Sequence, residues 1–183
     1  MKNANILRNV VFIKKLVYSA MFLASALVLP FLTGQVPEIG NMLCPMHLPV
    51  LLCGFVCGTS YGAVVGILAP LLRFMIFHAP TLFLALPMSA ELMAYGAFAG
   101  IFYRLMPKKA PFVYVSLFCS MLAGRTVWGV ASLMLAGIRG TSFTFATFWA
   151  GAVANAVPGI IFQIVFVPMI FFALRRARLI LNE

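Results

Sequence analysis

The sequence predicts an all-α integral membrane protein with six transmembrane helices, and its composition and charge distribution both favour this fold class. Hydrophobic residues make up 64% of the 183 residues and charged residues only 9%, and the mean hydropathy is +1.09. A soluble domain of this size needs more polar surface than such a composition supplies. Several apolar stretches approach the ~20 residues that a helix needs to cross a bilayer. We therefore expect a single membrane domain over residues 1–183.

The basic residues predict which side of the membrane each helix end faces. The net charge of +10 comes mainly from three groups of lysines and arginines outside the apolar stretches. These groups are Lys2, Arg8, Lys14 and Lys15, then Arg104, Lys108 and Lys109, then Arg175, Arg176 and Arg178. Membrane-protein loops rich in lysine and arginine face the cytoplasm, so both termini are expected there. A nucleic-acid-binding surface would instead need a basic stripe with interleaved polar residues.

Six helices follow from the apolar stretches and from the placement of the basic groups. They are expected at about 16–33, 47–58, 61–77, 89–106, 111–137 and 149–174. The stretch 47–77 is long for one crossing and short for two. Two crossings that turn near 58–61 put all three basic groups on the side of the N-terminus, whereas one crossing does not. At least one of these two helices must then be short, tilted or broken.

Three charged residues within the apolar stretches, Arg73, Glu91 and Arg125, are the first candidates for a substrate site. A charge at a helix centre costs about 2.5–3.5 kcal/mol, so mid-helix Arg125 needs either a ligand or a structural charge partner. Glu91 lies in an expected first turn, where the helix dipole also suits a carboxylate. Arg73 is close enough to a helix end to reach the membrane interface. Two arginines against one carboxylate leave a positive charge that a small anion would balance.

Polar and aromatic residues near these charges extend the candidate site. Trp128 shares a helix face with Arg125, and Tyr95 lies one turn after Glu91. His47 begins the second expected helix, where it either lines a pocket or lies at the membrane interface. A stripe in the last expected helix serves either a ligand or helix packing. Its members are Gly151, Asn155, Gly159 and Gln163, of which Asn155 is the predicted ligand contact.

A run of glycines after the first loop predicts a close contact with a moving neighbour. Glycines at four-residue spacing share one helix face and allow another backbone to approach closely. The four are Gly54, Gly58, Gly62 and Gly66. We refer to them below as the glycine face.

The sequence offers little for catalysis or metal binding. It contains no nucleotide-binding P-loop, no serine-hydrolase motif and no zinc-protease motif. Three acidic residues and two histidines are too few for most hydrolases and metalloenzymes. Cys53 and Cys57 lie one turn apart without a nearby acid or second histidine, which favours a packing role. We therefore expect no enzyme activity, no bound metal and no cofactor in this chain.

The first helix contains Ala20-x-x-x-Ala24. This motif resembles the alanine motif by which substrate-binding (S) components of energy-coupling factor (ECF) vitamin transporters dock on their transmembrane partner. Other segments are similar to the same family. They are Pro45–Gly58, Tyr61-Gly62, Gly66, Glu91 with Tyr95-Gly96, and Ala123-Gly124-Arg125. Chain length, six expected helices and cytoplasmic termini agree with the resemblance.

The resemblance implies a high-affinity substrate-binding subunit of an ATP-driven vitamin importer in a prokaryotic cell membrane. Its partners would be one transmembrane T component and two ATPase subunits, which would hydrolyse the ATP. Small residues on the first three helices would form the docking surface, and here Ala20, Ala24 and the glycine face are the candidates. Among vitamins, an anion such as pantothenate agrees with the surplus positive charge, and folates, biotin and a phosphorylated vitamer remain alternatives.

Two other functional classes remain open on the sequence alone. A self-sufficient secondary transporter or channel for a small organic anion would need no partner. An intramembrane enzyme is disfavoured by the missing catalytic motifs. Solute uptake by the isolated chain in liposomes distinguishes the first of these from an importer subunit.

Overall fold

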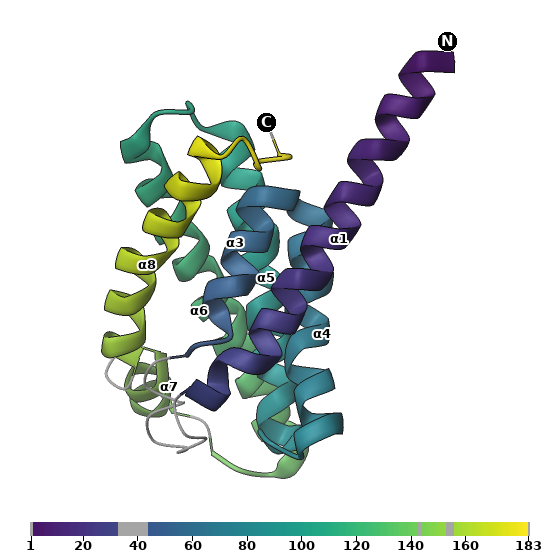
Figure 1. Ribbon diagram of the computed structural model, residues 1–183. Helices are drawn as coiled ribbons and strands as arrows, with labels where there is room; N and C mark the ends of the chain where they lie inside the picture. The colour runs from purple at the N-terminus through teal and green to yellow at the C-terminus, as the bar shows by residue number, and fades with distance from the viewer. Residues whose placement is uncertain (1, 33–43, 143, 153–155, 183) are drawn as a thin grey trace.

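The computed structural model describes residues 2–32, 44–142, 144–152 and 156–182, and every regular element in these ranges is a helix. The helices are α1 (Lys2–Leu32), α3 (His47–Cys57), α4 (Thr59–Phe77), α5 (Leu82–Leu105), α6 (Ala110–Arg139), α7 (Phe145–Ala152) and α8 (Val157–Arg176). They form one bundle, from which the first turns of α1 project (Figure 1).

Five of these helices, α1, α4, α5, α6 and α8, are long and apolar enough to cross a membrane. The chain is thus a multi-pass membrane protein. Helix α3 has only 11 residues, or about 16 Å at 1.5 Å per residue, which is half the thickness of a bilayer core. The described residues therefore form five helices long enough to cross a membrane and two shorter ones, α3 and the eight-residue α7, where the sequence predicted six crossings.

The short helix is possible because the rest of the bundle surrounds it. Every residue of α3 is buried, and α3 contacts α1, α4, α5 and α8. Backbone that leaves a helix at membrane depth is tolerated where protein covers it. Gly58 makes the break between α3 and α4 with a φ of 102°, a conformation that favours glycine.

The predicted last helix is divided into two elements. Helix α7 ends at Ala152 and α8 begins at Val157, with Pro158 in the first turn of α8, where a missing backbone N–H costs nothing. Helix α5 begins at Leu82, seven residues before the predicted start. The outer connection after α4 is therefore shorter than the sequence suggested.

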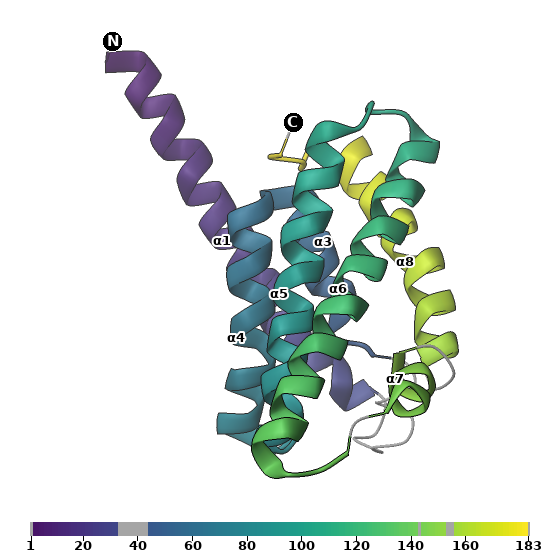
Figure 2. The same ribbon diagram turned by 180° about the vertical axis from the view of Figure 1, so that it is seen from behind.

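The helices alternate in direction, so that α3, α5 and α8 run the same way along the bundle (Figures 1 and 2). The N-terminal start of α1 and the C-terminal end of the chain lie at the same end of the molecule. This agrees with termini on one side of a membrane, which the basic groups predicted to be the cytoplasmic side.

The glycine face is buried inside the bundle. A Cβ atom on Gly54 or Gly62 would collide with the carbonyl of Gly96, and one on Gly66 would collide with the carbonyl of Leu92. These glycines thus allow α3 and α4 to pack directly on the backbone of α5. Their close neighbour is a helix of the same chain, and they are not on an outer surface that a partner could contact.

Three aromatic rings join α3, α5 and α8 near the end where the termini lie. The ring centroids of Phe55 and Tyr103 are 5.9 Å apart, those of Phe55 and Phe171 are 5.5 Å apart, and those of Tyr103 and Phe171 are 5.2 Å apart. Aromatic pairs at such distances stabilise a core beyond their area of contact. We call Phe55, Tyr103 and Phe171 the aromatic layer.

The C-terminal tail closes the same end of the bundle. The Asn182 side-chain amide donates hydrogen bonds to the carbonyls of Gly54 (3.5 Å) and Gly100 (3.3 Å), and the Leu181 N–H donates to the Val56 carbonyl (2.9 Å). Carbonyls in the last turn of a helix lack partners within the helix. The tail thus supplies donors to the end of α3.

Candidate functional site

A buried ion pair between α5 and α6 is the centre of the candidate site. Arg125 Nη1 lies 2.9 Å from Glu91 Oε1, and the Glu91 side chain is only 3% exposed. Both residues lie within membrane-crossing helices, where an unpaired charge is expensive. Each charge is therefore stabilised by the other.

His47 and Tyr95 complete a group of four that we call the polar cluster, together with Glu91 and Arg125. His47 Nε2 lies 3.5 Å from Glu91 Oε1, and the His47 ring meets the Tyr95 ring edge to face at 5.1 Å. Because His47 is the first residue of α3, the carboxylate of Glu91 also lies near the positive end of a helix dipole. The short length of α3 is what places this helix end inside the bundle.

The polar cluster contains more hydrogen-bonding atoms than the described residues satisfy. Nδ1 and Nε2 of His47, Oη of Tyr95 and Nε of Arg125 are buried without a hydrogen-bond partner among them. Glu91 Oε1 is also buried without a hydrogen-bond partner among the described residues. Its contact with Arg125 has the distance of an ion pair but not the geometry of a hydrogen bond. Buried polar atoms in proteins are nearly always bonded. So many buried polar atoms without partners in one place indicate a ligand site.

Gln163 of α8 has the same property and was missing from the predicted contacts. Its side chain is fully buried, and neither amide atom has a hydrogen-bond partner in the described part of the chain. It shares a helix face with Phe171, which contacts Phe55 of α3. The stripe of small and polar residues in the sequence included Gln163, but its position in a helix interior gave no sign that its amide would lack a partner.

Arg73 lies away from the polar cluster, between α4 and α1. Its guanidinium donates a hydrogen bond to the Leu27 carbonyl of α1 (3.0 Å) and lies over the rings of Phe31 (5.4 Å) and Phe77 (5.6 Å). Gly66 of α4 contacts Leu92, which is the neighbour of Glu91 on α5. Arg73 lies seven residues after Gly66, or roughly 10 Å further along α4. Arg73 thus joins α1 to α4, and the structure does not bring it to Glu91 and Arg125.

This placement removes the surplus positive charge that the sequence predicted for the site. The cluster contains one arginine and one carboxylate in contact, so its net charge is zero when His47 is neutral. The prediction of an anionic substrate counted Arg73 as a third member. That count was wrong for this site because cation–aromatic and carbonyl contacts stabilise the Arg73 charge within the protein.

Trp128 contacts α7. A Cβ atom on Gly151 would collide with the Trp128 ring, and the Trp128 and Phe148 ring centroids are 6.2 Å apart. Gly129, the next residue, holds the Phe148 ring in the same way. Trp128 therefore fixes α7 beside the helix that carries Arg125.

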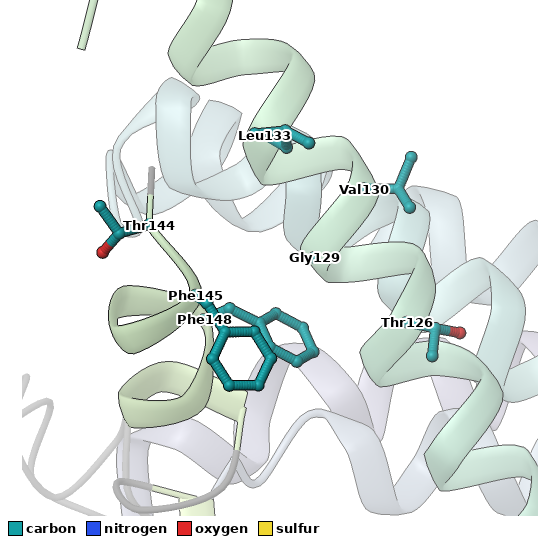
Figure 3. A pocket seen from close by; sticks show the side chains of 7 residues that line it. All are labelled: Thr126, Gly129, Val130, Leu133, Thr144, Phe145 and Phe148. Carbon is teal, nitrogen blue, oxygen red and sulfur yellow. The ribbon is translucent and has the colours of Figure 1, made fainter. Parts of the chain in front are cut away.

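An apolar groove of about 420 Å³ lies beside this contact, between α6 and α7. Figure 3 shows its lining and the Phe145 and Phe148 rings next to Gly129. The lining residues are Thr126, Gly129, Val130, Leu133, Thr144, Phe145 and Phe148. None of them is charged, so this groove cannot supply the charged contacts expected of the substrate site.

The remaining predicted residues divide into three groups. Asn155 lies outside the described residues. Of the glycine face, Gly54, Gly62 and Gly66 pack on α5, and Gly58 faces the Asn182 side chain. Ala20 and Ala24 are exposed on α1. Among the described residues, no three histidine, cysteine or acidic side chains lie close enough to hold a metal ion.

Comparison with known families identifies the chain. A family model described as the substrate-specific component of ECF transporters matches residues 14–171. This range includes the whole polar cluster, Gln163 and the exposed alanines of α1. Comparison with curated proteins and with solved structures gives no match. The chain therefore belongs to the family of substrate-specific components of ECF transporters.

Proposed function

We propose that this chain is the high-affinity substrate-binding subunit of an ATP-driven ECF importer, and that the solute binds at the polar cluster. The observation that carries this proposal is the set of buried polar atoms on His47, Tyr95 and Arg125 that have no hydrogen-bond partner among the described residues. Each unsatisfied buried group costs about 1–3 kcal/mol. A bound solute that supplies the missing hydrogen bonds would recover this free energy.

The position of the cluster supports binding from one side of the membrane. The N-terminal end of α3 carries His47 and faces away from the termini, whereas its other end is closed by the aromatic layer and by the C-terminal tail. Since the termini lie at the closed end and the basic groups favour a cytoplasmic position for it, the solute would reach His47 from outside a prokaryotic cell.

The exposed face of α1 is the proposed docking surface for a transmembrane T component. Large apolar residues cover this face, and Ala20 and Ala24 make a shallow notch in it. The exposed residues around them are Ile13, Leu16, Val17, Met21, Val28 and Phe31. Small residues let a second helix approach closely in a membrane. Two ATPase subunits on the T component would supply the energy.

The docking proposal predicts a separation of binding from transport. An Ala20→Leu/Ala24→Leu double variant fills the notch without adding a charge, so assembly with the T component should fall at least about tenfold, or about 1.4 kcal/mol. Solute binding should be unchanged, because α1 contributes nothing to the polar cluster. Co-purification of the partners measures assembly, and Val28→Leu on the same face is the matched control. Loss of solute binding in the double variant would contradict a docking role.

A vitamin is the proposed class of solute, with pantothenate as the sequence-based candidate. Arg125 is paired with Glu91 and Arg73 lies apart, so the polar cluster has no surplus positive charge to attract the carboxylate of pantothenate. The amide and hydroxyl groups of pantothenate still suit unpartnered donors and acceptors.

Reconstitution in liposomes tests the proposed function against a self-sufficient transporter or channel. The chain alone should bind solute without accumulating it, and accumulation should require the T component, the ATPases and ATP. Robust uptake by the chain alone would favour a secondary transporter and contradict the proposal.

A further inference from the structure

Three polar residues occupy equivalent positions along α3, α5 and α8. Phe55, Tyr103 and Phe171 are in mutual contact, and the three helices run in the same direction. The residues eight positions before them, about two turns or roughly 12 Å along each helix, are His47, Tyr95 and Gln163. We call these three residues the polar layer. The contact between the His47 and Tyr95 rings (5.1 Å) confirms the register for two of the helices.

An apolar layer separates the polar layer from the aromatic layer. Its members, one turn along from the polar layer, are Leu51, Ala99 and Val167, and all three are 0% exposed. The polar layer therefore has no route to water through the closed end of the bundle. Hydrogen bonds made in such surroundings are stronger than in water, and unmade ones cost more.

All three side chains of the polar layer are able both to donate and to accept hydrogen bonds. A neutral imidazole has one donor and one acceptor, a phenol hydroxyl has both, and a carboxamide has two donors and an acceptor oxygen. Their polar atoms are buried and have no hydrogen-bond partner among the described residues. A carboxylate or phosphate only accepts, so it would leave the acceptors of the layer unsatisfied. A group that both donates and accepts would satisfy more of them.

The two opposite charges beside the polar layer also favour an uncharged group of the solute. Glu91 and Arg125 are in contact at 2.9 Å and cancel. A full charge brought into a buried site with no opposite charge is strongly unfavourable. An anionic group placed here would compete with Glu91 for Arg125 and would leave one carboxylate unpaired.

We propose that the polar layer binds an uncharged part of the solute that carries both a donor and an acceptor, such as an amide, a ureide or a hydroxylated ring, and that Gln163 is its main specificity-determining residue. This inference rests on the proposed substrate-binding function. Any charged group of the solute would lie outside the layer. The polar layer thus selects solutes by hydrogen-bond pattern, and the ion pair excludes an added charge.

A substitution at Gln163 separates a ligand contact from a structural role. Gln163→Met keeps the size of the side chain and removes the unpartnered amide, so the ligand-free protein should unfold at a temperature equal to or higher than wild type. Solute affinity should fall at least about tenfold. Gln163→Leu is the second variant if the first folds poorly. Ser120→Ala is the matched control, because the buried Ser120 hydroxyl already donates to the Ser116 carbonyl (2.6 Å). It should leave affinity unchanged.

The probes are matched pairs of small molecules that differ in charge: panthenol and pantothenate, nicotinamide and nicotinate, and biotin amide and biotin. Thermal unfolding of the purified protein measures binding of each. The uncharged member of at least one pair should stabilise the wild type more than its acid, and Gln163→Met should abolish that difference.

Three results would overturn the inference. They are tighter binding of the acid in all three pairs, no stabilisation by any member of the panel, and a ligand-free Gln163→Met protein less stable than wild type. Failure of the proposed function looks different. In that case the uncharged probes would bind, yet the T component and the ATPases would add no ATP-dependent uptake.

Discussion

Arg73 and Arg125 are both arginines within membrane-crossing helices, yet their surroundings differ in kind. The Arg73 guanidinium bonds to a backbone carbonyl of α1 and lies between two phenylalanine rings. Arg125 pairs with Glu91 and is surrounded by side chains whose polar atoms have no partner in the described part of the chain. A charge in a membrane helix therefore does not by itself mark a binding site. Unsatisfied neighbours are the better indicator.

The largest expected effect comes from breaking the Arg125 pair. Arg125→Ala leaves Glu91 charged, buried and unpaired, which should destabilise the protein by about 3–5 kcal/mol. A Glu91→Leu/Arg125→Met double variant removes both charges and should be about as stable as wild type. Denaturant unfolding in detergent measures both. Equal stability of Arg125→Ala and wild type would show that the pair is not a buried ion pair.

A smaller effect is expected at Arg73, and on stability alone. Arg73→Met loses one hydrogen bond to Leu27 and two ring contacts, which together contribute about 1–2 kcal/mol. Solute affinity should stay within about twofold of wild type, because a twofold change is only about 0.4 kcal/mol. Arg73→Lys keeps the charge and controls for its loss. A tenfold loss of affinity in Arg73→Met would return Arg73 to the site and restore the case for an anionic solute.

The smallest effect on stability is expected from Tyr95→Phe. The Tyr95 hydroxyl makes no hydrogen bond among the described residues, so its removal should change ligand-free stability by less than about 1 kcal/mol. Affinity should fall by about threefold to tenfold, because the hydrogen bond between the hydroxyl and the solute is lost. Tyr103→Phe, two turns along in the aromatic layer, is the matched control and should leave affinity unchanged. Identical affinities for wild type and Tyr95→Phe would contradict a solute contact.

Much of the candidate site follows from the sequence because membrane burial restricts where charges and polar groups can lie. Mid-helix Arg125 needed either a ligand or a charge partner, Glu91 was the one acid within the apolar stretches, and Tyr95 lay one turn after Glu91. The structure brings these three together with His47. The sequence could not show that Arg73 was already satisfied, because its partner is a backbone carbonyl and carries no sequence signal.

The fold shows a similar division between what a sequence pattern specifies and what it leaves open. Apolar stretches predicted an all-helical chain, and basic groups predicted both termini at the same end of it, as the structure shows. The four-residue spacing of glycines specified a close helix contact, but not whether the neighbour belongs to the same chain. In the structure the neighbour is α5 of the same chain, whose Leu92 and Gly96 carbonyls lie against these glycines. Pattern alone also could not show how far α3 falls short of a full crossing, since that depends on burial by its neighbours.

The most direct test is to identify by mass spectrometry the small molecule that co-purifies with the wild type and with the Glu91→Leu/Arg125→Met double variant. We predict that the wild type retains one small solute and that the double variant, although folded, retains at least about tenfold less of it. Equal amounts of the same solute in both proteins would contradict binding at the polar cluster.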